Sequence, residues 1–262
     1  MNNKIDPLWW KEEYGFFGEF YKEGDNSKEG YLISEKQTLE ERTEKEVNGV
    51  IKLLELNPGS RVLDIPCGYG RHSNALAKKG FQVTGTDINK KFLDHAKVSA
   101  STAEFILINM KDIAYDDAFD AVINMFFSFG FFDTDEENFK CLMNMYSALK
   151  KNGKLLMHTD VNVPRITNGK YKLNEIRPLQ SGKKLHINET YNENTKRIEG
   201  FWNIEQNHGK STKKYYSQRV YTMEEFSDMC SKAGFIKTEA FGNWDGSPYH
   251  EKSEDMIIVA QK

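Results

Sequence analysis

The order of apolar and polar positions along the chain predicts an α/β fold. Short apolar runs, which are typical of buried strands, occupy residues 61–65, 81–86, 104–108, 119–124 and 154–159. Amphipathic stretches with a helical period follow three of these runs, at residues 71–79, 89–98 and 135–150. Strands that alternate with helices form a mostly parallel sheet, and helices cover both of its faces.

The pattern changes after residue 160. Three segments there have the composition of strands and are joined by polar turns, namely 184–191, 197–206 and 213–220. They predict an antiparallel β insertion after the fifth strand. Thr222 and Glu225 have the spacing of a capping box, which opens a helix over 223–233. Two last strands, at 235–241 and 255–260, bring the main sheet to seven strands.

The amino-terminal part of the chain has a different character. Its first 33 residues are rich in aromatic side chains without a clean period, and a helix is predicted over 35–56, with Ser34 or Thr38 as its N-cap. We therefore divide the chain into four parts, which are a lid with helices (1–56), the sheet core (57–160), the β insertion (161–221) and a segment that completes the core sheet (222–262).

Composition limits the kinds of partner. The chain has 262 residues and a formal net charge of −3, which gives no electrostatic reason to expect nucleic acid or an anionic membrane. No apolar run approaches the ~20 residues that span a bilayer. From the polar residues 1–7 we expect no signal peptide. Three widely spaced cysteines indicate neither disulfides nor a metal site, so we expect a cytoplasmic protein without a bound metal.

The most informative stretch is 61–73, where a short strand ends in an acid, a glycine turn follows and a helix begins. This is the nucleotide-binding corner of a Rossmann-like sheet. Gly68 and Gly70 allow a ligand to approach the backbone closely. Asp64 would repel the pyrophosphate of a dinucleotide and would attract a cationic amino group. We therefore expect S-adenosylmethionine (SAM) rather than NAD at this corner.

A second acid, Asp87, ends the next strand. At that place a carboxylate can accept hydrogen bonds from both hydroxyls of a ribose, although Asp87 could also be a helix N-cap. After the third strand, Asn109 or Asp112 could receive the adenine amino group, or the segment could be an ordinary polar loop. The predicted cofactor site comprises Asp64, Pro66, Cys67, Gly68, Gly70, Asp87, Ile88, Asn109, Met110 and Asn124.

Together these motifs resemble the class I SAM-dependent methyltransferases. Pro66 stands where the family usually has the first of three alternating glycines. The resemblance implies that Asp64 contacts the methionine part of SAM, that Asp87 contacts the ribose, and that an adenine-binding residue stands at Asn109. The sequences of residues 67–73, 85–87 and 124–130 resemble those of bacterial glycine and sugar-amine N-methyltransferases. In these enzymes an antiparallel insertion covers the acceptor site.

The segment after the fourth strand is the acceptor side in this family. It reads Asn124-Met125-Phe126-Phe127 and lacks the two prolines of enzymes that methylate planar amino groups on bases or glutamine. Phe126, Phe127 and Phe129 could wall the methyl path or simply pack in the core. Candidate catalytic residues are His158, Asp160 and Tyr31, and His158 could equally be a satisfied histidine inside the sheet.

We expect a methyltransferase that uses SAM and releases S-adenosyl-L-homocysteine (SAH). It would act by in-line displacement on nitrogen or oxygen of a small-molecule acceptor, as a monomer or homodimer. The alternatives are a peptide or RNA methyltransferase and a non-catalytic protein that binds SAM or SAH. An NAD dehydrogenase is disfavoured by Asp64 and by Ser73, which stands where a third glycine is expected.

Overall fold

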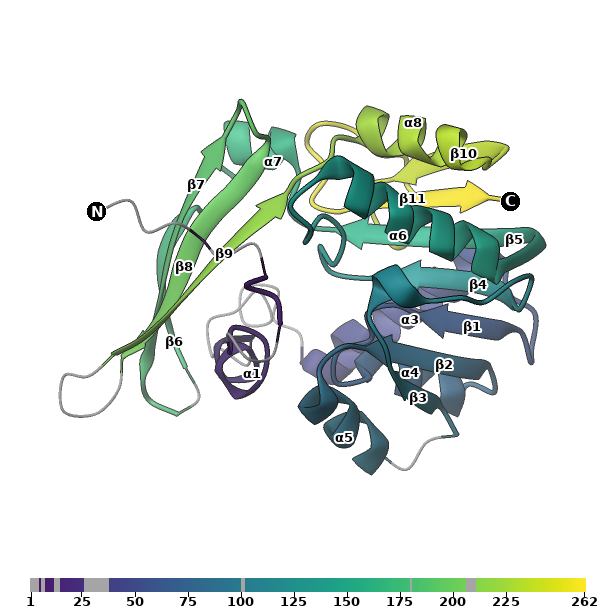
Figure 1. The fold of residues 1–262 in the computed structure, drawn as a ribbon, viewed down its shortest axis with the longest axis horizontal. Coiled ribbons are helices and arrows are strands. Elements are labelled where there is room, and N and C mark those ends of the chain that lie inside the picture. The colour runs from purple at the N-terminus through teal and green to yellow at the C-terminus, as the bar shows by residue number, and fades with distance from the viewer. Residues whose placement is uncertain are drawn as a thin grey trace.

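The chain folds into two β-sheets with helices, as seen in a computed structural model. The structure describes residue 5 and residues 8–11, 15–25, 38–99, 102–179, 181–205 and 211–262. A seven-stranded sheet and a four-stranded sheet stand beside each other, and a short helix, α1 (Glu19–Asp25), lies between them (Figure 1). Tyr31, one of the predicted catalytic residues, lies outside the described residues.

The large sheet confirms the predicted fold class. Its order is β10-β11-β5-β4-β1-β2-β3, and the five strands from β1 to β5 pair in parallel, whereas β11 is antiparallel to both of its neighbours. The strands are β1 (Arg61–Asp64), β2 (Gln82–Asp87), β3 (Glu104–Leu107), β4 (Phe119–Asn124), β5 (Leu149–Thr159), β10 (Lys237–Phe241) and β11 (Met256–Gln261). The chain reverses its direction of winding between β1 and β4, so the crevice outside their carboxyl ends is the expected ligand site.

Helices cover both faces of this sheet because its central strands are apolar on both sides. Val62 packs with α3 (Leu39–Leu54) and α4 (Arg71–Lys78), whereas the next residue, Leu63, packs with α6 (Asp135–Ala148) and α8 (Met223–Ala233). Helix α5 (Lys90–Val98) contacts β2 and β3. Thr38 is the N-cap of α3 and Thr222 that of α8, each in a complete capping box.

The predicted insertion is a four-stranded antiparallel sheet in the order β6-β7-β8-β9. Its strands are β6 (Asn174–Pro178), β7 (Lys184–Asn192), β8 (Arg197–Glu205) and β9 (Ser211–Arg219). The sequence analysis missed β6, an edge strand that is largely polar and ends at a proline. It also missed α7 (Val163–Thr167), whose five residues are too few to show a helical period.

Strand β5 begins earlier than its composition predicts. We expected a helix to residue 150 and a strand from 154, but α6 ends at Ala148 and β5 starts at Leu149. Residues 150–153 are not apolar, so the sequence pattern does not show that the strand begins at Leu149. The register of β5 with β4 also shifts between Phe119 and Ala121. Phe119 pairs with Leu149 and Ala121 pairs with Lys154, and apolar alternation cannot reveal such an irregular pairing.

Aromatic contacts attach the amino-terminal segment to the small sheet. The indole N–H of Trp9 donates to the Ser217 carbonyl at 2.9 Å, and the ring of Phe16 lies 5.0 Å from that of Tyr216. Both Trp9 and Phe16 are buried. The amino-terminal segment therefore closes the space between the two sheets. Among the helices that the structure describes, none has both the length and the apolar character of a membrane span.

Candidate functional site

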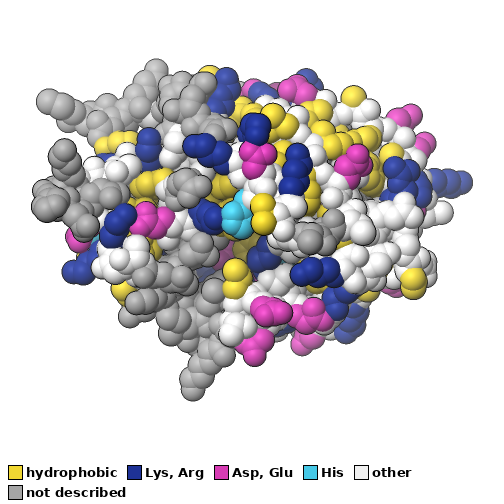
Figure 2. Space-filling model, turned by 90° about the horizontal axis from the view of Figure 1, so that it is seen from below, with side chains coloured by type: hydrophobic (Ala, Val, Ile, Leu, Met, Phe, Trp, Pro, Cys, Tyr) yellow, Lys and Arg dark blue, Asp and Glu magenta, His cyan; other side chains and the backbone are white. Residues whose placement is uncertain are grey.

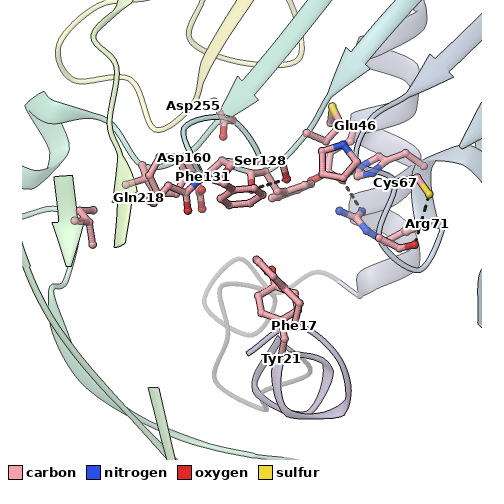
Figure 3. Close-up of a pocket in the computed structure, with 18 of the residues that line it drawn as sticks. Phe17, Tyr21, Glu46, Cys67, Arg71, Ser128, Phe131, Asp160, Gln218 and Asp255 are labelled. Atoms are coloured by element: carbon pink, nitrogen blue, oxygen red, sulfur yellow. Dashed lines mark hydrogen bonds and ion pairs between the residues drawn. The ribbon is translucent and has the colours of Figure 1, made fainter. Parts of the chain in front are cut away.

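A cavity of about 1290 Å³ opens at the carboxyl ends of β1, β2 and β4. Its wall also includes residues of the small sheet and of the amino-terminal segment. In Figure 3, Glu46, Cys67 and Arg71 lie on one side, Phe131, Asp160 and Gln218 lie on the other, and Phe17 and Tyr21 face them across the gap. Sites for one drug-sized molecule usually measure about 300–1,000 Å³, so this cavity has room for two reactants.

The turn after β1 presents backbone to the cavity. The N–H of Cys67 donates to the Thr86 carbonyl at 2.8 Å, which joins the turn to β2. Gly68 has a φ of +55°, a conformation that favours glycine, and a Cβ built on it would meet no protein atom within 4 Å. Since Gly68 lines the cavity, this open space is available to a ligand that lies against the backbone.

Two buried carboxyl groups flank the turn. Asp64 accepts a hydrogen bond from the Ser73 hydroxyl at 2.6 Å. Asp87 accepts one from the Gly68 N–H at 2.9 Å and one from the Asn89 N–H at 2.8 Å. Burial raises the pKa of Asp64 to about 7, opposed by the Ser73 hydroxyl and reinforced by the nearby charge of Asp87. Burial also raises the pKa of Asp87 to about 6, against the backbone N–H donors.

Burial thus disfavours the charged forms of both carboxylates more than the nearby donors and the charge of Arg71 favour them. A cationic or hydrogen-bond-donating ligand would stabilise their charged forms. The alternative that Asp87 is a helix N-cap does not hold, because the N-cap of α5 is Asn89, whose side chain accepts from the Phe92 N–H at 3.2 Å. Asp87 instead lines the cavity, with one carboxylate oxygen bound to the Gly68 N–H and the other to the Asn89 N–H.

The other residues of the predicted cofactor site divide into two groups. Those that line the cavity are Pro66, Cys67, Ile88, Asn109 and Met110. Gly70 and Asn124 do not line it. A Cβ at Gly70 would come within 2.7 Å of the Ala96 Cβ, so this glycine permits helix packing. The amide of Asn124 donates to the Ile65 carbonyl at 2.7 Å and thus supports the turn from behind.

The two catalytic candidates that the structure describes, Asp160 and His158, differ in their access to the cavity. Asp160 lines the cavity, but His158 does not and is fully buried. Its Nδ1 accepts from the Phe126 N–H at 3.3 Å, so its Nε2 donates to Asp255, 3.0 Å away. This geometry matches the alternative of a satisfied histidine, which here holds the turn after β4.

That turn is conformationally unusual. Phe126 and Phe127 both have positive φ, of 56° and 51°, which side chains rarely adopt without support from their surroundings. The Phe127 N–H donates to the His158 carbonyl at 3.1 Å, and the Gln218 amide donates to the Phe129 carbonyl at 3.2 Å. The fold thus fixes the backbone of the predicted acceptor side, and Phe126 and Phe127 line the cavity.

A cluster of charges that the sequence pattern did not predict lies beside the glycine turn. Glu46, on α3, is buried and bonds Arg42 and Arg71, each at 2.5 Å, and His72 at 2.9 Å. Burial, together with the charge of Arg71, lowers the pKa of His72 to about 4, so its ring is a neutral donor. A detectable signal existed, because Arg42 and Glu46 interrupt the apolar stripe of α3.

Burial alone would raise the pKa of Glu46. The hydrogen bond from His72 and the positive charges of Arg71 and Arg42 instead hold this pKa well below its ordinary value of 4.5. The guanidinium carbons of Arg42 and Arg71 also lie 4.5 and 4.9 Å from the centre of the Phe126 ring. The cluster therefore joins α3, α4 and the turn after β4 at one edge of the cavity.

Comparison with known proteins gives the site a family context. A family model described as a methyltransferase domain matches residues 62–153, which contain Asp64 and Asp87. The cypemycin N-terminal methyltransferase of a Streptomyces species is 24% identical over 208 residues, with 78% of this chain and 84% of that protein covered. The match to the family model confirms the predicted resemblance.

Solved structures share the fold at low identity. A SAM-dependent methyltransferase from Clostridium acetobutylicum ATCC 824 has a TM-score of 0.72 at 12% identity and covers 92% of this chain and 97% of its own. SAM-bound CalS10, an amino pentose methyltransferase from Micromonospora echinaspora, has a TM-score of 0.65 at 18% identity, with coverages of 88% and 95%. These likenesses show that most of the chain shares the fold of these two proteins.

The Glu46 cluster yields a prediction about stability. Glu46→Gln should lower the free energy of unfolding by about 3 kcal/mol at pH 7, because it leaves the guanidinium groups of the buried Arg42 and the half-buried Arg71 without this counter-charge. Since the pKa of Glu46 is lowered in the fold, its stabilising contribution is complete above about pH 4.5 and is lost as the pH falls further. Urea unfolding of both proteins between pH 3 and 7 measures this.

Glu44→Gln is the matched control for this prediction. Glu44 lies on the same helix and pairs with Lys79, but 56% of its side chain is exposed, so its loss should change stability little. Equal stability of Glu46→Gln and the parent protein at pH 7 would contradict the proposed importance of the buried cluster.

Proposed function

We propose that this chain, which contains a SAM-dependent methyltransferase domain, transfers the methyl group of SAM to nitrogen or oxygen of a small-molecule acceptor by in-line displacement. One observation carries the proposal: two buried, poorly neutralised carboxylates flank an open glycine turn inside a cavity with room for two molecules. The match to a methyltransferase domain supports SAM as the methyl donor. The size of the cavity supports the binding of an acceptor beside SAM.

The residues present fit SAM. Asp64 would bind the amino group of its methionine part, since an ammonium ion stabilises a buried carboxylate. Asp87 would accept the ribose hydroxyls, and its two backbone N–H partners keep it oriented. Asn109 and Met110 line the wall proposed for adenine. Arg71 lines the cavity beside the turn and would attract the carboxylate of the ligand.

SAM supplies an electrophilic methyl group on a sulfonium, and the chain has little to add beyond alignment. Holding two reactants in line removes about 7–11 kcal/mol of encounter cost. Phe127 and Phe131 line the cavity and would exclude water from the methyl path. Asp160 also lines it and would accept a proton from the acceptor. His158 would act indirectly, because it fixes the turn that carries Phe126 and Phe127.

A small-molecule acceptor is supported by the likeness to CalS10, whose description names an amino pentose. A peptide amino terminus is the second candidate, because the Streptomyces relative is named as an N-terminal methyltransferase of cypemycin. On the described part of the face in Figure 2, basic and acidic side chains are interspersed, which does not favour RNA.

Turnover tests the proposal against a non-catalytic SAM-binding role. The parent protein, incubated with SAM and a pool of small amines and alcohols, should form SAH and a product heavier by one methyl group. Asp64→Asn should lower SAM affinity at least tenfold, because the buried carboxylate gives way to a neutral amide. Calorimetry with SAM and mass spectrometry of the products measure the two effects.

Asp94→Asn is the control, since Asp94 is an exposed residue of α5 that pairs with Lys90. It should leave SAM affinity unchanged. Binding of SAM without formation of SAH with any amine, alcohol or peptide would sink the enzymatic proposal. Unchanged SAM affinity in Asp64→Asn would show that the donor site is misplaced.

Proton release provides a further prediction. The pKa of Asp64 is raised to about 7 in the free protein, and a bound amino group favours its charged form. Binding should therefore release a proton near neutral pH, and affinity should fall by up to about tenfold for each pH unit below 7. Calorimetry in two buffers of different ionisation enthalpy, between pH 5 and 7.5, measures this linkage. A flat profile would contradict it.

A further inference from the structure

A buried carboxylate on the small sheet has no role in the proposed binding of SAM. Glu189, on β7, is 3% exposed and lines the same cavity. Leu185 and Ile187 precede it at alternate positions of the strand and belong to an apolar cluster. Since side chains at alternate positions of a strand lie on the same face, the pattern of β7 predicts an apolar side chain at position 189. A charged group there needs a separate explanation, since burial of a carboxylate is costly.

The neighbouring strands make room for this side chain. Gly200 on β8 lies opposite Glu189, and Tyr216 on β9 lies opposite Gly200. A Cβ at Gly200 would come within 3.0 Å of the Glu189 Cγ. With glycine there, Glu189 reaches across β8 and accepts a hydrogen bond from the Tyr216 hydroxyl, while the Tyr171 hydroxyl donates to its other oxygen at 2.9 Å.

The partners that orient Glu189 are neutral. Among the described residues, no lysine or arginine forms an ion pair with it, and the guanidinium of Arg177 pairs with Glu175 instead. Lys170 and Lys172 also line the cavity, but both are exposed. Burial raises the pKa of Glu189, although the hydroxyls of Tyr216 and Tyr171 and the charge of Arg177, which forms no ion pair with it among the described residues, oppose this. A cationic group in the cavity would offset the cost of the buried charge.

Aromatic rings surround the same part of the wall. The ring of Phe16 lies 5.0 Å from that of Tyr216 and 5.5 Å from that of Trp202. The ring of Tyr21 stacks on Trp202 at 5.5 Å with an interplanar angle of 10°. All four of these residues line the cavity. Aromatic faces attract alkylammonium groups, and the attraction increases when water is excluded.

This wall lies close to the predicted acceptor side. Gln218 follows Tyr216 by two residues on β9, and its amide binds the carbonyl groups of Phe127 and Phe129. Two residues of a strand span about 7 Å. A molecule held at Glu189 would therefore have to extend by only a few bonds to reach the turn that follows β4.

We propose that Glu189, with the rings of Trp202 and Tyr216, forms the acceptor subsite and binds a protonated amine of the acceptor. This inference rests on the proposed function and narrows its acceptor to molecules that carry an amine. The buried carboxylate supplies the counter-charge, the rings exclude water, and the tyrosine hydroxyls fix the carboxylate oxygens. A neutral molecule of the same shape would leave the carboxylate unpaired.

Benzylamine and benzyl alcohol are matched probes for this subsite. They are titrated into the full chain saturated with SAH, and binding is followed by ligand-observed NMR. The parent protein should bind benzylamine about tenfold more tightly than benzyl alcohol. Glu189→Gln, whose amide can still bond both tyrosines, should abolish this preference. Glu189→Asp, which keeps the charge, should retain it.

Glu205→Gln is the control, since Glu205 is an exposed carboxylate at the end of β8 that pairs with His186. It should retain the full preference. Equal affinity of the two probes for the parent protein, including no detectable binding of either, overturns the subsite. Retention of the preference in Glu189→Gln also overturns it.

Titration of SAM into the same proteins separates the two proposals. Failure of the parent protein to bind SAM would overturn the proposed function. Intact SAM binding without an amine preference would overturn the acceptor subsite alone. Circular dichroism of each variant verifies that the fold is retained.

Discussion

The cavity depends on the hydrogen bond between the Gly68 N–H and the Asp87 carboxylate. This bond joins the turn after β1 to the end of β2, and a second bond, from Cys67 to Thr86, reinforces the connection. The carboxylate is buried at some energetic cost, because its charge is poorly compensated. The hydrogen bond that shapes the turn therefore also holds a buried carboxylate at the cavity wall, where a ligand that donates hydrogen bonds would stabilise its charge.

The buried carboxylates of the cavity wall differ in how their charge is balanced. Around Glu46 the protein supplies cations in direct ion pairs. The side chains that donate hydrogen bonds to Asp64 and Glu189 are hydroxyl groups, and the charges of Arg71 and Arg177 act on these carboxylates without an ion pair among the described residues. A buried charge that is fully paired stabilises a fold, whereas one that is oriented but unpaired favours binding.

Much of the fold and the placing of most of the predicted cofactor residues around one cavity could be predicted from the sequence, because both depend on local patterns. The run from Arg61 to Ser73 encodes a strand, a turn and a helix within 13 residues. The part of the cavity wall around Glu189 could not be predicted, since it depends on contacts between distant segments. Glu189 meets Tyr216 only because of a glycine on the strand between them, and His158 meets Asp255 across 97 positions.

The aromatic lining of the cavity has an optical consequence. The chain contains four tryptophans, and all of them, Trp9, Trp10, Trp202 and Trp244, line this one space. Their ultraviolet emission consequently originates around this cavity. Trp9, Trp10 and Trp244 are buried and Trp202 is half-buried, so an occupant that displaces water from Trp202 will alter the emission spectrum, and the protein carries an intrinsic reporter of its own occupancy.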